Sequence, residues 1–301
     1  MIDFIVNPAA GNGRGAAVWE QVERVLRQRR IVYRLHLTAA TGSAVKLTRE
    51  LLQLGPDLIV AIGGDGTVHE VVNGMYERGA GSGCRIGYIP AGSGNDFARG
   101  HGIPLQPLEA LEYVLTARSV KAIDLLRVGG KVAVSSIGSG LDGKVAEVTN
   151  RAGYKRWLNR LKLGKLAYAI SLIRVLAAYR PRDTTLMVDG KEHRIAKVWL
   201  IAICNIPQYG GGMRICPNAD PADGKAELCV VSGISRWELL YLFPLVYGGN
   251  HVRHRAVRFF SGVHLDIAAD RGVVNHMDGE MAAPGPLTIS VLPKRLSVVC
   301  R

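Results

Sequence analysis

Three times in its first hundred residues the chain passes from a short apolar segment into a glycine-rich loop. The three apolar segments are residues 3–6, 58–62 and 85–89, and a fourth, at 31–38, largely alternates between apolar and polar positions. Strands that alternate with helices form a parallel sheet covered on both faces. Because parallel strands end at one edge of such a sheet, the three loops should lie together there, where ligands bind.

The helices between these strands are visible in the apolar spacing. Ala44, Leu47 and Leu51 recur at helical intervals behind Ser43, which we expect to cap that helix. A second helix is expected from Val68 to Met75, and another begins near residue 16, behind the first loop. The first part of the chain is therefore predicted to be an α/β unit.

The three loops share a composition that suits phosphate. They span residues 7–15, 63–67 and 90–96, and glycines recur in each of them. Glycine lets backbone N–H groups approach phosphate oxygens, and the helix N-terminus behind each loop favours an anion. No loop contains Gly-x-Gly-x-x-Gly or the Gly-Lys-Ser/Thr of a P-loop, and no Gly-x-Ser-x-Gly occurs anywhere. The pattern favours a polyphosphate site outside the common dinucleotide, Walker and hydrolase classes.

The positive charge of the chain is unevenly distributed. The 301 residues correspond to about two domains. The net charge is +13, yet the chain up to Asp124 contains 13 basic and 12 acidic residues. Ten basic residues and a single acidic one, Glu147, lie in residues 144–182. Such a segment is expected to face an anionic membrane surface, although a solvated helix surface or nucleic acid would also fit.

Localisation is predicted from what the sequence lacks. The five cysteines form no Cys-x-x-Cys pair, so we expect them to be reduced. The first residues do not resemble an export signal. The longest apolar helical stretch, residues 166–179, contains Arg174 and is shorter than the roughly 20 residues of a membrane span. We therefore expect a cytoplasmic protein that associates peripherally with the inner membrane face.

Residues 63–74 resemble the nucleotide loop of the diacylglycerol kinase catalytic-domain family, which includes bacterial soluble lipid kinases. The resemblance covers essentially the whole chain. The first loop from Asn7 and the third loop from Gly92 are similar to the other two loops of that family. Residues 209–225 resemble its metal-binding turn, and Asp278-Gly-Glu280 resembles its base-carrying turn.

The departures from the family pattern are few. Ser93 replaces a usual Thr and retains the hydroxyl. Ala226-Glu227 replaces Leu-Asp beside the metal turn, and Met281 replaces Pro. These changes affect the packing of the metal turn more than the phosphate loops.

The resemblance implies a fold of two domains. The first is a Rossmann-like, phosphofructokinase-like α/β nucleotide domain formed by residues 1–124 and completed by 283–301. The second is an all-β sandwich domain for the lipid substrate, residues 125–282. The sequence agrees, because residues after Asp124 form strand-like runs, at 132–137, 185–188, 198–203, 227–231, 263–268 and 287–292. Only residues 165–179 look helical in this part.

The resemblance also implies ATP as phosphoryl donor and a set of nucleotide-binding residues. These residues come from the first two loops, the end of the second strand and the third loop: Asn7, Pro8, Ala9, Ala10, Gly11, Thr38, Gly63, Gly64, Asp65, Gly66, Thr67, Val68, His69 and Ser93.

The implied catalytic residues are Glu280, as general base, and Asp65, as a contact to a metal or its water. The resemblance also implies a structural Mg²⁺ held by Asp223 and by backbone carbonyls near Asp220 and Lys225, since oxygen ligands suit a hard cation. Asp96 either joins the metal ligands or caps the helix that follows it.

The expected reaction is transfer of the γ-phosphoryl group of ATP to a lipid hydroxyl, most readily that of diacylglycerol. A sphingoid base or phosphatidylglycerol would use the same residues, so the acceptor stays open. NAD kinase is a second hypothesis, because it shares Gly-Gly-Asp-Gly-Thr, and a nucleotide-responsive binding protein without turnover is a third. We expect a lipid substrate and a membrane surface as partners, rather than nucleic acid. The sequence leaves open whether the chain forms a homodimer.

Overall fold

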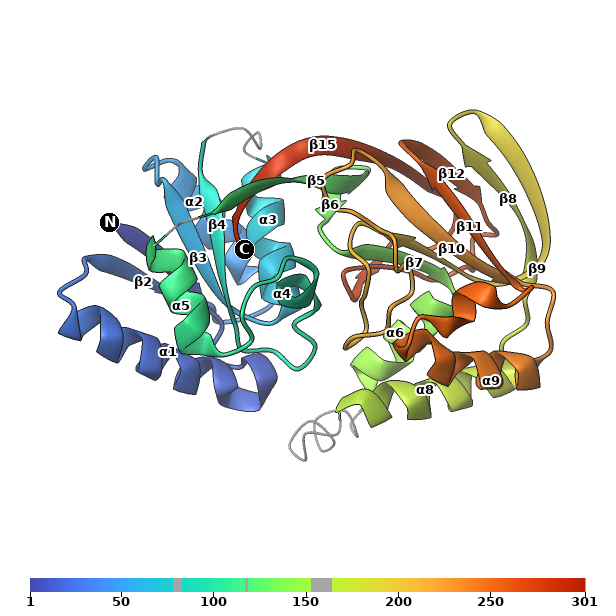
Figure 1. Cartoon of the computed structure of the whole chain (residues 1–301), viewed down its shortest axis with the longest axis horizontal. Coiled ribbons are helices and arrows are strands. Elements are labelled where there is room, and N and C mark those ends of the chain that lie inside the picture. Colours follow the sequence, from blue (N-terminus) through green and yellow to red (C-terminus); the bar gives the residue numbers. More distant parts are fainter. Residues whose placement is uncertain (78–82, 117–118, 153–163, 301) are drawn as a thin grey trace.

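The computed structural model describes residues 1–77, 83–116, 119–152 and 164–300. The first part of the chain forms a parallel sheet with the strand order β2-β1-β3-β4 (Figure 1). Its strands are β1 (Ile2–Val6), β2 (Tyr33–Leu37), β3 (Leu58–Gly63) and β4 (Arg85–Pro90). Every residue of β3 is buried, because helices cover both faces of this sheet.

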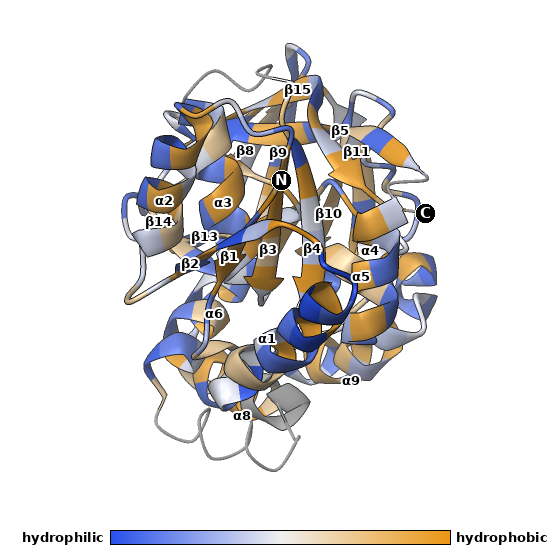
Figure 2. Ribbon diagram, turned by 90° about the vertical axis from the view of Figure 1, so that its left-hand side faces the viewer, coloured by the Kyte–Doolittle hydropathy of each residue, from blue (hydrophilic) through white to orange (hydrophobic). Residues whose placement is uncertain are grey.

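Helices pack on the two faces of the parallel sheet. On one face α2 (Ser43–Leu52) packs against α3 (Asp65–Glu77), and on the other α1 (Ala10–Gln28) packs against α5 (Pro107–Thr116). A short helix, α4 (Asp96–Gly100), follows β4. Figure 2 shows the apolar strands enclosed by helices whose outer faces are hydrophilic.

The expected cap of α2 is wrong. The N-cap residue is Gly42, and the hydroxyl of Ser43 instead accepts a hydrogen bond from the N–H of Ala40. The carboxylate of Glu70 on α3 accepts the N–H groups of Gly42 and Ala44, at 2.8 and 3.0 Å. A negative charge from a neighbouring helix therefore satisfies the start of α2 in place of a local hydroxyl.

The second part of the chain is mainly antiparallel. Strand β9 pairs with β7, β8 and β10, and β8 continues through β12 to β15. The β-rich, sandwich-like fold expected for this part is confirmed. Its strands are β5 (Val120–Val128), β6 (Lys131–Ala133), β7 (Ser136–Gly140), β8 (Arg182–Val188), β9 (Lys191–Cys204), β10 (Ala226–Ser232), β11 (Val257–Gly262), β12 (His264–Ala268), β13 (Asn275–Met277), β14 (Glu280–Ala282) and β15 (Leu287–Val299).

The expectation of a single helix in this part is wrong. Helices α6 (Leu141–Arg151) and α9 (Arg236–Tyr247) accompany α8 (Gly164–Ala178), and a 3₁₀ turn spans Asn250–Arg253. Helix α9 is almost continuously apolar and contains Pro244, so its sequence has no clear helical period. Its start is nevertheless marked by a capping box between Ser235 and Glu238. Within the described residues, no helix has the length and hydropathy needed to cross a membrane.

Strand β15 joins the two parts of the molecule. It pairs with β12 and β5, and near its end Val298 pairs in parallel with Ile86 of β4. Figure 1 shows β15 curving from the antiparallel part over to the parallel sheet. The domain boundary predicted at residue 124 falls inside β5, which pairs with β15 along most of its length.

All five cysteines are buried with free thiols.

Candidate active site

The first loop follows β1 and turns through three consecutive left-handed residues. Gly11, Asn12 and Gly13 have φ values of 57°, 60° and 90° within the first turns of α1. A Cβ on Gly11 would lie 2.3 Å from the carbonyl oxygen of Ala91 in the third loop, so only glycine fits there. The first and third loops are therefore in direct contact.

The second loop completes the same edge of the sheet. The amide of Asn7 donates to the hydroxyl of Thr67 at 3.3 Å, which joins the first and second loops. A Cβ on Gly64 would lie 3.3 Å from the Cα of Gly92, which joins the second and third. Helix α3 begins in this loop at Asp65, so its N-terminal N–H groups and positive dipole end lie among the three loops.

The three loops line a cleft of about 1830 Å³, to which the second part of the chain also contributes. Two cationic side chains that the sequence interpretation missed, Arg14 and Arg99, lie in it too. Arg14 lies between two glycines of the first loop, and this position in the sequence could have identified it as a phosphate-binding residue. Of the predicted residues, those that line the cleft are Asn7, Ala9, Ala10, Gly11, Thr38, Gly64, Asp65, Gly66, Thr67, Ser93, Asp96 and Glu280.

The other predicted residues do not line this cleft. Pro8, Gly63 and Val68 belong to its loops but lie outside its lining. A Cβ on Gly63 would lie 2.3 Å from the hydroxyl oxygen of Thr67, so this glycine allows the turn into α3. His69 and the metal turn are described below.

Two carboxylates meet beside the third loop. A Cβ on Gly94 would lie 3.0 Å from Oδ2 of Asp65 and 3.3 Å from Oδ2 of Asp96. Burial and the neighbouring charge of Asp96 raise the pKa of Asp65 to about 7, and burial also raises the pKa of Asp96. Such a pair of close, buried carboxylates favours a proton or a cation between them.

Asp96 does not cap the helix that follows. Asn95 is the N-cap residue of α4, and it has a left-handed conformation. The carboxylate of Asp96 accepts the N–H groups of Gly211 and Gly212, at 2.8 and 2.9 Å. Asp96 therefore ties the third loop to the glycine-rich turn of the second part.

Glu280 approaches the nucleotide loop from the opposite side. It is the first residue of β14, and its side chain is exposed in the cleft. A Cβ on Gly66 would lie 3.0 Å from Oε1 of Glu280. The carboxylate of Glu280 therefore lies over the start of α3, where the two parts of the chain meet.

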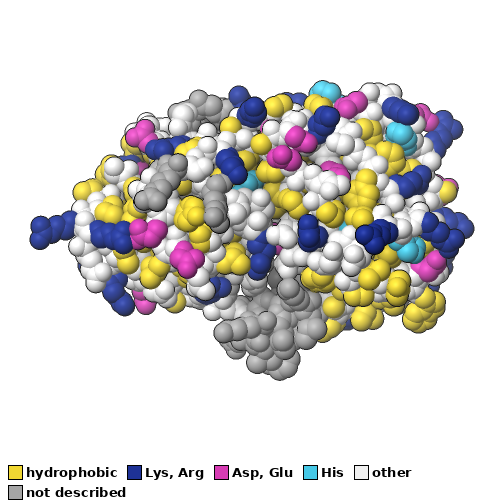
Figure 3. All heavy atoms as spheres, in the orientation of Figure 1, with side chains coloured by type: hydrophobic (Ala, Val, Ile, Leu, Met, Phe, Trp, Pro, Cys, Tyr) yellow, Lys and Arg dark blue, Asp and Glu magenta, His cyan; other side chains and the backbone are white. Residues whose placement is uncertain are grey.

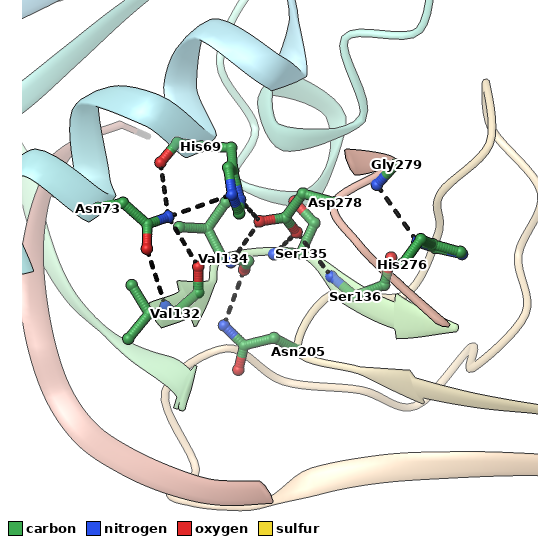
Figure 4. Close-up of polar contacts among 10 residues, drawn as sticks. All are labelled: His69, Asn73, Val132, Val134, Ser135, Ser136, Asn205, His276, Asp278 and Gly279. Atoms are coloured by element: carbon green, nitrogen blue, oxygen red, sulfur yellow. Dashed lines mark hydrogen bonds and ion pairs between the residues drawn. The ribbon is translucent and has the colours of Figure 1, made fainter. Parts of the chain in front are cut away.

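Asp278 anchors the turn that carries Glu280 (Figure 4). Its carboxylate accepts the N–H groups of Val134, Ser135 and Ser136 and contacts Nδ1 of His69 at 2.8 Å. Burial would raise the pKa of Asp278, but the bonds and charge of His69 and the backbone N–H groups hold it below the usual range. Asp278 thus fixes the position of Glu280 relative to α3.

His69 was predicted to contact the nucleotide, and the structure places its side chain elsewhere. Nδ1 faces Asp278, and Nε2 lies 3.3 Å from the amide nitrogen of Asn73. Burial lowers the pKa of His69, but the charge and hydrogen bond of Asp278 outweigh burial and raise it. The contact between His69 and Asp278 therefore joins the nucleotide helix to the second part of the chain, and the raised pKa of His69 favours its charged form.

Two asparagines reinforce this junction (Figure 4). Asn73 donates to the carbonyl of Val132 and accepts from its N–H, both at 2.9 Å. Asn205 donates to the carbonyls of Asp124 and Val134. Neither residue was singled out from the sequence, because each acts through a segment distant along the chain.

A buried polar cluster lies where the cleft meets an apolar cavity. The hydroxyl of Tyr209 donates to Oδ2 of Asp142 at 2.5 Å, and Nε2 of His276 lies 3.0 Å from the same oxygen. Asp142 and Tyr209 line both the cleft and the cavity, which measures about 60 Å³. Most of the other lining residues are apolar and come from α6, α8, α9, the sheet and the loop before β10, and His251 of the 3₁₀ turn also lines the cavity. The polar cleft therefore adjoins an apolar space, with Asp142 and Tyr209 in the wall of both.

The predicted metal turn lies outside the cleft. The carboxylates of Asp220 and Asp223 accept the N–H groups of Ala222 and Lys225, at 3.0 and 2.9 Å. Asp124 accepts the N–H of Gly224 at 2.6 Å and so holds the turn against β5. Across the described residues, no group of three or more His, Cys, Asp or Glu side chains has the geometry of a metal site.

One observation at this turn nevertheless fits a cation. Oε2 of Glu227 is buried and has no hydrogen-bond partner in the described part of the chain. Burial and the nearby charge of Asp223 raise the pKa of Glu227. An oxygen-binding cation between these two carboxylates would relieve both effects.

Comparison with known proteins decides the family. The diacylglycerol kinase catalytic domain matches residues 2–128, and the YegS C-terminal NAD kinase beta sandwich-like domain matches residues 135–300. A diacylglycerol kinase of Mycobacterium tuberculosis is 30% identical over 99% of this chain and 94% of its own length. The chain belongs to the diacylglycerol kinase family of lipid kinases. It is an ATP-dependent phosphotransferase.

A second relative and a solved structure are also similar to this chain. A diacylglycerol kinase of Bacillus subtilis is 26% identical, with 98% of this chain and 95% of that protein covered. A crystal structure of a diacylglycerol kinase from Bacillus anthracis superposes with a TM-score of 0.78, at 24% identity, over 100% of this chain and 96% of that one. The similarity to this structure shows the fold of the chain. It confirms the predicted combination of an α/β domain and a β-sandwich domain.

Proposed function

We propose that this lipid kinase transfers the γ-phosphoryl group of ATP to the hydroxyl of a membrane lipid, with diacylglycerol as acceptor. The observation that carries the proposal is the apolar cavity beside the polar cleft, with Asp142 and Tyr209 lining both. A soluble acceptor would not need an apolar space beside the phosphate loops. The relatives named diacylglycerol kinase support the choice of acceptor.

The phosphate end of the cleft is suited to ATP. Backbone N–H groups of the three loops, the N-terminus of α3 and the guanidinium groups of Arg14 and Arg99 all lie around it. Phosphoryl transfer requires mainly positioning and neutralisation of charge, and these groups supply both. The hydroxyls of Thr38 and Ser93, which also line the cleft, can donate to phosphate oxygens.

Glu280 is the group that we assign as general base. The acceptor hydroxyl attacks the γ-phosphorus, the bond between that phosphorus and the β–γ bridging oxygen breaks, and ADP leaves. The proton of the hydroxyl passes to the carboxylate of Glu280. Asp278 keeps this carboxylate over the start of α3, beside the phosphate loops.

The negative charge of the side chains at two places in the structure suits Mg²⁺. Asp65 and Asp96 would hold it in the cleft, because their close carboxylates raise each other's affinity for a cation. Asp223 and Glu227 would hold a structural ion at the turn. In the cleft the ion would neutralise phosphate charge during transfer.

Transfer of labelled γ-phosphate from ATP into mixed micelles tests the proposal. The micelles contain diacylglycerol, a sphingoid base, phosphatidylglycerol or a total lipid extract in turn, with NAD as the control acceptor. Label in diacylglycerol is expected. Label in another lipid would correct the acceptor, whereas label only in NADP, or none in any lipid, would overturn the proposal.

A further inference from the structure

Helix α9 exposes a stripe of large apolar side chains. Trp237 is 80% exposed and Tyr241 is 66% exposed, and Pro244 continues the stripe one turn further. Their spacing of four and three residues places them on one side of the helix. The opposite side, with Leu239 and Leu242, is buried in the core.

Helix α8 adds a second stripe beside the first. Ile170 and Ile173 are 39% and 59% exposed, whereas Leu172 of the same helix is buried. The two helices lie side by side (Figure 1), and the guanidinium of Arg236 donates to the carbonyl of Tyr179 at 3.2 Å. Figure 3 shows hydrophobic side chains gathered over this region, at the lower right. We call Ile170, Ile173, Trp237, Tyr241 and Pro244 the α8–α9 face.

Three exposed arginines lie near the residues of the α8–α9 face in sequence. Arg174 follows Ile173 on α8, Arg180 lies just beyond that helix, and Arg236 precedes Trp237; all three are exposed. Glu238 is the single acidic residue in the sequences of the two helices. Its carboxylate is already bound by Arg255 and by the N–H of Ser235. The apolar residues of the α8–α9 face are therefore adjacent in sequence to exposed positive charge.

The α8–α9 face lies over the apolar cavity of the active site. Leu172 of α8 and Leu239, Leu242 and Phe243 of α9 line that cavity from the inner sides of the same two helices. The two helices that carry the face therefore also form one wall of the cavity. The cavity in turn borders Asp142 and Tyr209 of the cleft.

We propose that the α8–α9 face docks on the surface of an anionic lipid bilayer, with Trp237 and Tyr241 inserted among the headgroups. Trp and Tyr favour the membrane interface, and nearby arginines are attracted to anionic lipids. A second copy of the chain fits less well, because a symmetric pair would bring Arg174 and Arg236 of both copies together. The inference rests on the proposed lipid-kinase function and names the partner of its site.

Sedimentation with vesicles of phosphatidylcholine alone, or with about one third phosphatidylglycerol, tests the face. The intact protein is expected to bind the anionic vesicles more tightly, and binding should weaken at high salt. The double variant W237S/Y241S should lose at least tenfold in partitioning. Each of Arg174→Gln and Arg236→Gln should lose about fivefold, which corresponds to about 1 kcal/mol per charge.

The matched control is V32S/L54S, which removes two apolar side chains of similar exposure, 68% and 64%, from the first part of the chain. It should bind vesicles as the intact protein does. Equal loss in both double variants, or no loss in W237S/Y241S, would overturn the proposal. So would a dimer of the intact protein that W237S/Y241S dissociates while vesicle binding is unchanged.

A second assay separates docking from catalysis. W237S/Y241S should phosphorylate a short-chain diacylglycerol dispersed in detergent at the normal rate and lose activity only on vesicle-embedded acceptor. Equal loss on both acceptors would overturn docking as the role of the face. If the intact protein binds vesicles through Trp237 and Tyr241 but phosphorylates no lipid, the proposed function fails and the docking surface stands.

Discussion

Replacing Asp65 by Asn should stabilise the folded protein at pH 8 while it abolishes catalysis. The carboxylates of Asp65 and Asp96 both lie beside Gly94, and because the pKa of Asp65 is raised only to about 7, Asp65 is mostly ionised at pH 8. The N–H of Phe97 donates to Oδ1 of Asp65 at 3.0 Å, and an Asn side chain can accept the same bond. The substitution therefore removes a repelled charge and retains the local structure.

The magnitude follows from the pKa of Asp65. Burial and the charge of Asp96 raise that pKa from an ordinary 3.8 to about 7. At about 1.4 kcal/mol for each pKa unit, the ionised carboxyl opposes folding by up to about 4 kcal/mol. The cleft is open to water and Asp96 can rearrange, so we take about half, or about 2 kcal/mol. For a chain of this length that is about 4 °C in the midpoint of thermal unfolding.

The pH dependence has a definite sign. The folded protein retains a proton on Asp65 between pH 3.8 and about 7 that the unfolded chain releases. The stability from this proton is present at low pH and is lost as the pH rises through about 7. The advantage of the Asn variant should therefore shrink by more than half at pH 5.

Thermal unfolding followed by circular dichroism at pH 8 and pH 5 measures both effects. The control is Asp57→Asn, which changes an exposed carboxylate before β3 and should shift neither midpoint. Equal midpoints for Asp65→Asn and the original protein at pH 8, or an advantage that grows on acidification, would refute the reasoning.

Three further substitutions probe the site. Gly66→Ala puts a methyl group 3.0 Å from Oε1 of Glu280. The rate of phosphoryl transfer should therefore fall about tenfold with no loss of thermal stability. An unchanged turnover rate would contradict this expectation. Gly11→Ala, at φ +57° and 2.3 Å from the carbonyl oxygen of Ala91, should weaken ATP binding at least tenfold in equilibrium dialysis, and an unaltered Kd would count against the loop packing. Asp278→Asn leaves His69 without its counter-charge and should lower the free energy of unfolding by about 3–5 kcal/mol in urea titration; a change below about 1 kcal/mol would show that the pair is unimportant.

The local sequence was sufficient to predict the parallel sheet and its three glycine-rich loops. A buried run such as residues 58–62, a glycine-rich turn and an apolar helix are all encoded within a few residues. The edge at which the loops meet then follows from the parallel direction of the strands. Helices α6 and α9 were missed because Gly143 and Pro244 disturb their local pattern. In α6 the glycine is needed, since a Cβ there would lie 2.0 Å from the carbonyl oxygen of Val274.

Contacts between distant segments could not be predicted from a single sequence. His69 and Asp278 are 209 residues apart, and Asp142 and His276 are 134 apart. His69 and Asp278 each belong to a motif that the sequence shows, but only the folded chain shows that they pair, and the same holds for Asp142 and His276. The same limit applies to Glu70 at the start of α2 and to Asp124 at the metal turn.

Transfer of labelled γ-phosphate to diacylglycerol by Glu280→Gln is the most direct test of the central claim. Gln has the shape of Glu but cannot take the proton of the acceptor hydroxyl. The rate should fall by about 10²–10⁴, with ATP affinity and the unfolding midpoint unchanged. Transfer at a rate close to that of the original protein would contradict the assignment of the cleft and of its base.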